Sequence, residues 1–360
     1  MKIEFYHIDA FEVPNYEPIY RQLIQLGVDA RMVGVPGERN TAASGWFDYE
    51  RFQQYCKERQ IPFTTAADSS ADLAVTTQNA DILRDYTCPR VRLMYGPILF
   101  PEAWGLQAHS VQPFDAVLTH GRAYTESFSK WLRPDQLLVA GYPRYDDYFS
   151  GLYSKKAIRA NWCVTEDKPV IVFLPTWDNN TGFDLFFPEL VRLASLYHII
   201  IRPHHCTMRL EPERVAMMRD SGLLILDHAF DLAEVYAAAD LIISDVRSGA
   251  LFEACLCDVP AVGMVLDSSE MHGWLARAGV GDMLSLCADP TQLQSAIQTA
   301  LTSHDQATQR QLWADAHVAY RDGTAGLRAA EALIQFATRK SKMLAPTNLC
   351  GLLTPTFYQS

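Results

Sequence analysis

The sequence predicts an α/β protein with two doubly wound, parallel-sheet domains, and three observations support this. The chain has 360 residues, more than the about 100 to 200 residues of a usual single domain. Apolar residues make up 49% of it, so it can bury a full core. Short apolar runs alternate with segments of helical period, as in buried parallel strands joined by helices. One large barrel is the alternative architecture.

The N-terminal half supplies seven apolar runs, each followed by a segment of helical period. They predict the strands of one doubly wound domain over residues 1–150. The runs are residues 2–8, 28–34, 61–66, 73–77, 91–96, 116–121 and 137–142.

A polar, lysine-bearing stretch between residues 151 and 169 predicts the domain boundary. Beyond it, helical patterns include a run over residues 290–340 that is broken near Asp322-Gly323. We therefore expect a second domain over residues 151–340 and a C-terminal tail over residues 341–360. Its five predicted strands are residues 170–174, 197–202, 223–226, 241–244 and 260–265.

Charge and hydropathy exclude several classes of protein. The net charge of -11 argues against nucleic-acid binding. The polar N-terminus does not resemble a signal peptide, and no window has the 18 apolar residues of a membrane span. We expect a cytoplasmic protein with at most peripheral contact at the inner face of the membrane. The eight cysteines lack redox or zinc spacing, which predicts reduced core residues.

In open α/β sheets ligands bind beyond the carboxyl ends of the strands. The first polar cluster at such a position includes Thr176 and Trp177, which would line a site or form a turn with a packed tryptophan. The second places Arg202, His204 and His205 after three isoleucines. Arginine and histidine suit anion recognition. Zinc is the weaker interpretation, because no third ligand lies at motif spacing.

The third cluster follows residues 241–244 and opens a helix near Ala250. The first amides of a helix attract anions, and Gly249 would let a phosphate approach the backbone. Ser248 is a ligand or an ordinary N-cap. Glu253, one turn further, is a candidate ribose ligand or a surface or capping carboxylate.

Two further clusters are weaker signals. Residues 322–324 break one helix and start another, as an ordinary loop and cap would. In the N-terminal half, Gly-Pro pairs and polar residues follow predicted strands, which indicates tight turns first and substrate contacts second. These segments are residues 94–109, 119–122 and 141–146.

The order of four motifs, PTWDNN, IRPHH, DLAEVYAAADLIISDVRSGALFEACLCDVPAV and DGTAGLR, resembles the C-terminal domain of the CDP-glycerol glycerophosphotransferase (teichoic acid polymerase) family. GYPRYD resembles the interdomain motif of the same family. The resemblance covers residues 94–328. It implies a GT-B fold, in which two Rossmann-like domains face each other across a cleft. The C-terminal domain would hold the nucleotide donor and the N-terminal domain the acceptor.

The resemblance also assigns roles to individual residues. Arg202 and His204 match the family's Arg-x-His-Pro motif near the donor phosphates. Ser248 matches a hydroxyl of its Ser-Asp-Tyr-Ser-Ser loop, in which Arg247 replaces another. The family's His-Gly motif aligns with Tyr95-Gly96, and a phenol is a poor base at pH 7. Other candidates to take the acceptor proton are His7, Glu102, His109 and His120.

The resemblance implies a transferase of cell-envelope or capsular polysaccharide biosynthesis. It would move glycerol phosphate, a related polyol phosphate or a sugar from a nucleotide-diphosphate donor, CDP-linked, to a hydroxyl of a polyol or glycan acceptor. No metal or other cofactor is expected, because arginine, histidine and a helix dipole neutralise the charge on the leaving nucleotide. The alternatives are a UDP-sugar 2-epimerase-like isomerase with its phosphate loop at Ser248-Gly249, and a non-catalytic nucleotide-binding protein.

Overall fold

The N-terminal domain is built on a seven-stranded sheet of order β3-β2-β1-β4-β5-β6-β7. In the computed structural model, residues 1–7, 12–34, 49–68, 70–84, 86–96, 108–165, 167–226, 231–266, 275 and 279–344 are described. All pairings in this sheet are parallel. Its strands are β1 Lys2–His7, β2 Asp29–Gly34, β3 Phe63–Thr64, β4 Leu73–Thr76, β5 Arg90–Leu93, β6 Ala116–Thr119 and β7 Leu137–Val139.

The C-terminal domain is built on a six-stranded parallel sheet of order β10-β9-β8-β11-β12-β13. The two-domain α/β fold class is therefore confirmed, and each predicted strand has a counterpart. The sequence analysis missed β13, because three residues with an exposed central leucine give no apolar run. The strands are β8 Val170–Leu174, β9 His198–Ile201, β10 Leu224–Ile225, β11 Leu241–Asp245, β12 Ala261–Met264 and β13 Ser285–Cys287.

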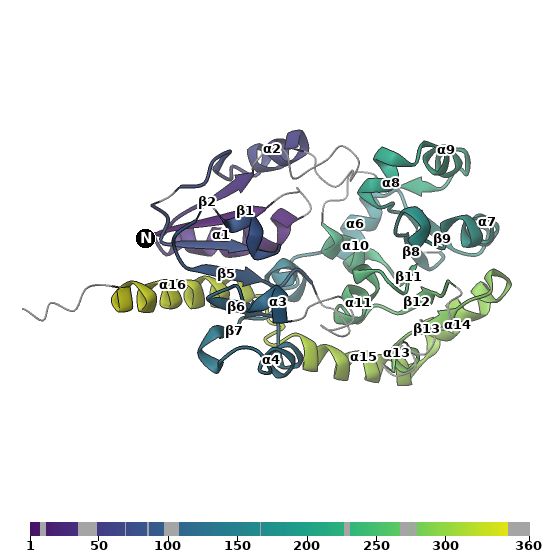
Figure 1. Cartoon of the computed structure of the whole chain (residues 1–360). Helices are drawn as coiled ribbons and strands as arrows, with labels where there is room; N and C mark the ends of the chain where they lie inside the picture. Colours follow the sequence, from purple (N-terminus) through teal and green to yellow (C-terminus); the bar gives the residue numbers. More distant parts are fainter. Residues whose placement is uncertain are drawn as a thin grey trace, which may run out of the picture.

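Helices connect the strands of both sheets (Figure 1). Those of the N-terminal half and the linker are α1 Val13–Gln25, α2 Tyr49–Glu58, α3 Ala108–Val111, α4 Arg122–Phe128, α5 Asp146–Phe149 and α6 Lys155–Asn161. The rest are α7 Phe183–Leu193, α8 His205–Leu210, α9 Pro212–Asp220, α10 Leu232–Ala238, α11 Gly249–Leu256, α13 Val280–Met283, α14 Leu293–Thr302, α15 His304–His317 and α16 Ala325–Leu344. Short 3-10 turns lie at Ala80–Leu83, Pro134–Gln136, Pro143–Tyr145, Asp178–Asn180 and Pro290–Gln292.

The last helix returns to the first domain. Figure 1 shows α16, in yellow, beside the N-terminal sheet, and its residues Ala329, Leu333 and Phe336 are buried in the same core as α1 and β1. This apolar stripe on α16 explains the return, because it has to be buried. The prediction that residues 151–340 all belong to the second domain therefore does not hold for α16.

Hydrogen bonds join Asp146, at the end of the GYPRYD segment (residues 141–146), to the N-terminus of α16. The Asp146 carboxylate accepts bonds from the backbone N–H groups of Ala325 (2.9 Å) and Gly326 (2.7 Å). Gly323 has a φ of +76°, and a Cβ there would lie 2.9 Å from the Asp146 carbonyl oxygen. The DGTAGLR segment is thus shaped by its contact with the GYPRYD segment, and the two motifs together set where α16 begins.

We expect Asp146→Ala to lower the free energy of unfolding by about 2 kcal/mol, because it leaves two helix N-terminal amides without their acceptor. Burial raises the pKa of Asp146 to about 6. The native state then binds more protons than the unfolded state between about pH 4 and pH 6, so this carboxyl stabilises more at pH 5 than at pH 7.5. Urea unfolding at both pH values should show the larger loss at pH 5. Asp147→Ala is the control, because Asp147 is next in sequence and exposed. Equal losses of stability in both variants would contradict a stabilising role for the hydrogen bonds between Asp146 and α16.

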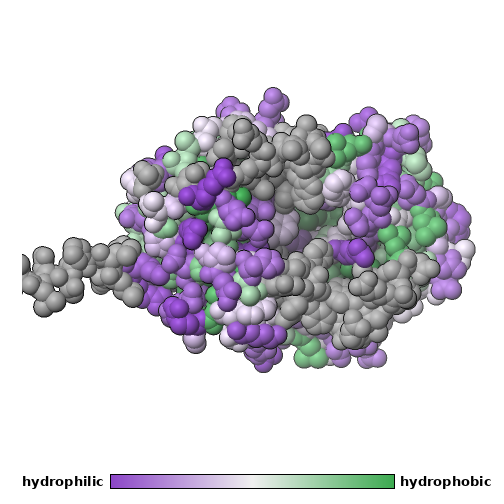
Figure 2. Space-filling view, viewed as in Figure 1, coloured by the Kyte–Doolittle hydropathy of each residue, from purple (hydrophilic) through white to green (hydrophobic). Residues whose placement is uncertain are grey.

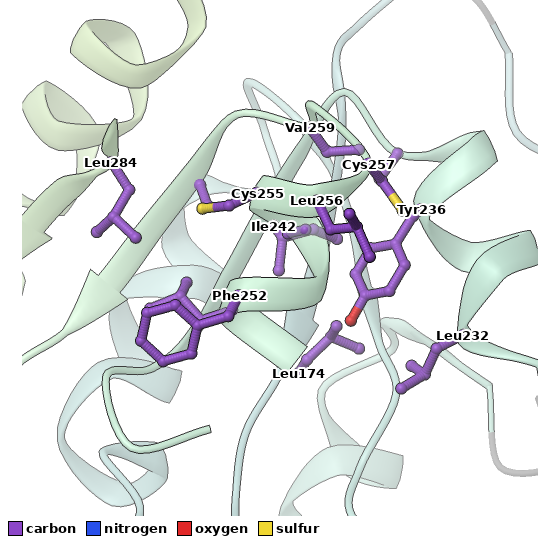
Figure 3. Close-up of a cluster of buried hydrophobic side chains, with 14 of the residues drawn as sticks. Leu174, Leu232, Tyr236, Ile242, Phe252, Cys255, Leu256, Cys257, Val259 and Leu284 are labelled. Atoms are coloured by element: carbon purple, nitrogen blue, oxygen red, sulfur yellow. The ribbon is translucent and has the colours of Figure 1, made fainter. Parts of the chain in front are cut away.

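The core of the C-terminal domain lies beneath α11. Figure 3 shows Tyr236, Phe252 and Leu256 gathered around Ile242 of β11. Cys255 and Cys257 belong to the same cluster, as expected of reduced core residues, whereas Cys163 is exposed. This packing fixes α11, and therefore its N-terminus, at the edge of the sheet.

Among the described residues, no helix is long and apolar enough to cross a membrane. The face drawn in Figure 2 is mostly hydrophilic where it is coloured. Exposed large apolar side chains come from separate elements, such as Leu152 in the linker and Leu312 on α15.

Candidate active site

Three predicted clusters meet at one edge of the C-terminal sheet. Strands β9, β8 and β11 are adjacent and parallel, so their carboxyl ends lie side by side. Thr176 follows β8, Arg202 follows β9, and Ser248 follows β11. The fold therefore gathers residues that are up to 72 positions apart into one candidate site.

Arg202 lies at the centre of a group of cations. Its guanidinium is half-buried, and burial lowers its pKa to about 10, with further lowering by the positive charges of Arg144 and Arg51. Arg202 stays protonated at pH 7. Arg51 comes from the N-terminal domain and Arg144 from the linker, so all three regions of the chain bring positive charge to this place. Such convergence favours an anionic ligand.

His204 and His205 are neutral at pH 7. Burial lowers the pKa of His204 to about 3 and that of His205 to about 4. The Nδ1 atom of His204 accepts a bond from the Cys206 N–H (3.2 Å), which places the proton of the neutral ring on Nε2. The Trp177 ring stacks on His204 at 6.0 Å between centroids. His204 is thus held as a hydrogen-bond donor rather than as a cation.

A metal ion is a second candidate ligand for this segment. The ligand atoms of His204, His205 and Cys206 lie within 4.8 Å of one another. Cys206 would be the third ligand of such a site, and it follows the histidines directly instead of at motif spacing. The nearby Arg202 and Arg51 charges, which depress the pKa of His205, also oppose a divalent cation. The electrostatics favour an anion.

Asp245 ties the β8 loop to the end of β11. Its carboxylate, almost fully buried, accepts bonds from the N–H and the hydroxyl of Thr176 (2.7 and 2.8 Å) and from the N–H of Gly182 (2.6 Å). Burial raises the pKa of this carboxyl. Asp245 was not predicted as a site residue, although its position directly after the predicted strand at residues 241–244 is a signal for one.

The N-terminus of α11 forms the other side of the site. Ser248 is its N-cap and accepts a bond from the Ala250 N–H (3.3 Å). A Cβ added to Gly249 would meet no atom within 4 Å, so the space over this backbone is open. Arg247 is exposed beside it. The capping interpretation of Ser248 is confirmed, and a cap of this kind leaves the remaining first-turn amides available to an anion.

Glu253 joins the two domains. Only 6% of it is exposed, and its carboxylate accepts bonds from the hydroxyls of Tyr142 (3.0 Å) and Tyr236 (3.3 Å). The interpretation of Glu253 as a surface carboxylate is therefore wrong. Both oxygens are engaged by tyrosines, which argues against the predicted ribose contact in this conformation.

Of the predicted proton acceptors, the structure describes the side chains of His109 and His120. His120 is fully buried, its Nδ1 lies 3.1 Å from the Gly141 carbonyl oxygen, and burial lowers its pKa to about 4. This burial argues against the predicted role of His120 toward an acceptor. Glu102 lies outside the described residues. His109 is exposed on α3.

The fold defines a two-domain GT-B protein, and its candidate site is an edge of the C-terminal sheet that is suited to an anion. The sequence model of the CDP-glycerol:poly(glycerophosphate) glycerophosphotransferase family matches residues 109–335. The chain belongs to this family, and it is a transferase that uses a nucleotide-linked donor. The family match includes the β8, β9 and β11 loops.

Solved structures with this fold include the wall teichoic acid polymerase TagF, soaked with CDPG. It is 17% identical, with a TM-score of 0.64 over 95% of this chain and 90% of that chain. A putative UDP-N-acetylglucosamine 2-epimerase from Listeria monocytogenes is 14% identical, with a TM-score of 0.64 over 94% and 97%. The UDP-GlcNAc 2-epimerase from Neisseria meningitidis, bound to UDP-GlcNAc, is 12% identical, with a TM-score of 0.62 over 93% and 100%. No curated protein matches the chain.

Proposed function

We propose that the protein transfers glycerol phosphate from CDP-glycerol to a hydroxyl of a polyol or glycan acceptor. The proposal rests on one observation: Arg202 and His204 follow β9, and the open backbone at Gly249 follows β11, at the same edge of the sheet. A diphosphate needs charge-assisted donors and close backbone approach, and this edge offers both.

In this reaction the acceptor oxygen forms a bond to the distal phosphorus of the donor. The bond between that phosphorus and the bridging oxygen breaks, and CMP leaves with the electron pair. The acceptor hydroxyl releases its proton to solvent as the new bond forms, and CMP carries away the negative charge. Arg202 and the α11 amides would neutralise the charge that gathers on the bridging oxygen and on CMP. His204 would donate a hydrogen bond from Nε2 to a phosphate oxygen. No metal is needed for this charge balance.

Membership of the family and the donor-binding half of the fold support the proposed donor, and the TagF structure soaked with CDPG is consistent with it. The fold is shared with UDP-GlcNAc 2-epimerases, so a uridine-linked sugar is the competing donor. Calorimetric titration with CDP-glycerol, CMP, UDP-N-acetylglucosamine and UDP compares the two directly. Micromolar binding of CDP-glycerol with release of CMP on addition of an acceptor would support the proposal. Preference for the uridine ligands would overturn it.

The Gly249→Ala substitution tests where the donor binds. The added methyl group meets no protein atom within 4 Å, and alanine is the better helix former, so the variant should be as stable as wild type or up to about 1 kcal/mol more stable. The same methyl group would keep a phosphate from the backbone and should weaken CDP-glycerol binding by about tenfold or more. Calorimetry and urea unfolding measure the two effects.

The control for this substitution is Gly281→Ala on α13, where a Cβ would make only an ordinary 3.8 Å contact with Leu286. It should leave donor affinity unchanged. Unaltered CDP-glycerol binding by Gly249→Ala would remove the α11 N-terminus from the proposed site.

A further inference from the structure

Tyr95 is the accessible member of a buried group of tyrosines between the domains. It follows β5 by two residues and is 44% exposed, whereas Tyr142, Tyr145 and Tyr236 are each 2% exposed or less. Burial nevertheless raises the pKa of Tyr95 above its ordinary value. The Tyr95 side chain therefore combines contact with the protein with access to solvent.

Hydrogen bonds connect the backbone of Tyr95 to the donor helix. The Tyr142 hydroxyl lies 3.1 Å from the Tyr95 carbonyl oxygen and 3.0 Å from a carboxylate oxygen of Glu253 on α11. A Cβ on Gly96 would lie 3.4 Å from the Tyr142 hydroxyl, so the loop passes close against this ring. Tyr95 and Gly96 are thereby held beside α11, whose N-terminus carries Ser248 and Gly249.

The side chain of Tyr95 faces charged groups of the same cluster. The positive charge of Arg144 acts on the phenol and opposes the rise in its pKa, whereas the negative charges of Glu253 and Glu12 add to it. Arg144 also lies close enough to Arg202 to lower its pKa. Arg144 therefore interacts electrostatically with both Tyr95 and Arg202. Tyr95 belongs to the N-terminal domain, Arg144 to the GYPRYD segment and Arg202 to the C-terminal domain.

We propose that Tyr95 contacts the transferred phosphoryl group and stabilises it by donating a hydrogen bond from its hydroxyl, and that Tyr142 and Glu253 are positioning residues that hold the Tyr95 loop against α11. This inference rests on the proposed function. Tyr95 keeps its proton throughout and forms no bond to the substrate. A neutral donor aimed at the reacting phosphate acts where negative charge builds up, and it comes from the domain that faces the acceptor.

The test is Tyr95→Phe, which removes one hydroxyl and keeps the ring. We expect kcat with CDP-glycerol to fall by about 30-fold or more while the dissociation constant of the donor changes by less than about threefold, because the bond strengthens as the transition state forms. The ratio of wild-type to variant kcat should stay constant from pH 6.5 to 9, since the phenol does not ionise in this range. Tyr320→Phe, at a 54% exposed tyrosine, is the control and should keep wild-type kinetics.

Glu253→Gln tests the positioning residues. It should lower kcat with little change in donor affinity, and the double variant Tyr95→Phe with Glu253→Gln should be no slower than the more impaired single variant, because both act through one contact. Additive losses of kcat would show that Glu253 and Tyr95 act independently, and they would overturn the positioning role of Glu253. The melting temperature of each variant, followed by circular dichroism, shows whether it is folded.

The outcomes distinguish the two proposals. If wild type transfers glycerol phosphate and Tyr95→Phe is within threefold of it, only the role of Tyr95 fails. A kcat ratio that grows tenfold per pH unit would make the phenolate a base and also overturn this role. If wild type turns over no cytidine donor, the proposed function fails, and the inference that rests on it fails as well.

Discussion

Replacing Arg202 with glutamine should lower kcat/KM for CDP-glycerol by about 100-fold, which corresponds to about 2.7 kcal/mol of transition-state free energy. Arg202 is the cation placed at the end of β9, and its pKa of about 10 keeps it charged at every pH at which the protein would be assayed. Its effect on a diphosphate is large because the site is partly buried, where charges are poorly screened. Glutamine keeps much of the length and removes the charge and the planar fork of donors.

Steady-state kinetics and calorimetry of the Arg202 variant would check this expectation. Fold stability should not fall, since the substitution relieves repulsion from Arg144 and Arg51. Arg219→Gln, an exposed arginine on α9, is the matched control and should retain wild-type kcat/KM. Near-normal kcat/KM in the Arg202 variant would place the donor phosphates elsewhere in the molecule.

Replacing Asp245 with alanine should lower the free energy of unfolding by about 3 kcal/mol, because two backbone N–H groups and a hydroxyl lose their only charged acceptor in a buried place. The same change frees the β8 loop, so Thr176 and Trp177 are no longer held beside His204. Donor affinity should therefore fall together with stability. This coupling follows from the position of the carboxylate between two strands that both lead into the site.

Urea unfolding and donor titration of the same preparation measure both consequences. Asp220→Ala, at an exposed position at the end of α9, should change neither. Asp245→Asn keeps the shape and one acceptor oxygen, so it should lose less stability than the alanine variant. A stable Asp245→Ala protein with normal affinity would show that the β8 loop is held by other contacts.

Part of the site was predictable because it depends on local sequence. A polar residue directly after a buried parallel strand has to lie at the carboxyl edge of the sheet, and this rule places Thr176, Arg202 and Ser248. The position of Ser248 as a helix N-cap follows from the same pattern. Three isoleucines before Arg202 were enough to identify β9 as a buried strand.

The roles of buried polar residues were not predictable in this way. Glu253 has the spacing of a surface or ribose-binding carboxylate, yet two tyrosine hydroxyls take up its oxygens. The sequence predicts His120 at the end of a strand, where it would be accessible. In the structure it is buried, and its carbonyl oxygen accepts a bond from the N–H of Ala319, which lies between α15 and α16. Tyr142 lies 111 residues from Glu253 in the sequence, and Ala319 comes from a distant segment to bond His120. Spacing within one segment does not reveal such contacts.

The sequence by itself determined the two parallel sheets, the order of their strands along the chain and the three loops that meet at the candidate site, because hydrophobic period and strand-end polarity are local properties. Only the tertiary structure decided that α16 packs on the first domain, that Asp146 caps it, and that Tyr142 links the Tyr95 backbone to Glu253 on α11. Those outcomes depend on which apolar faces pack together and which polar groups form hydrogen bonds once the two domains are folded. Such contacts join distant segments, so the local sequence pattern does not predict them.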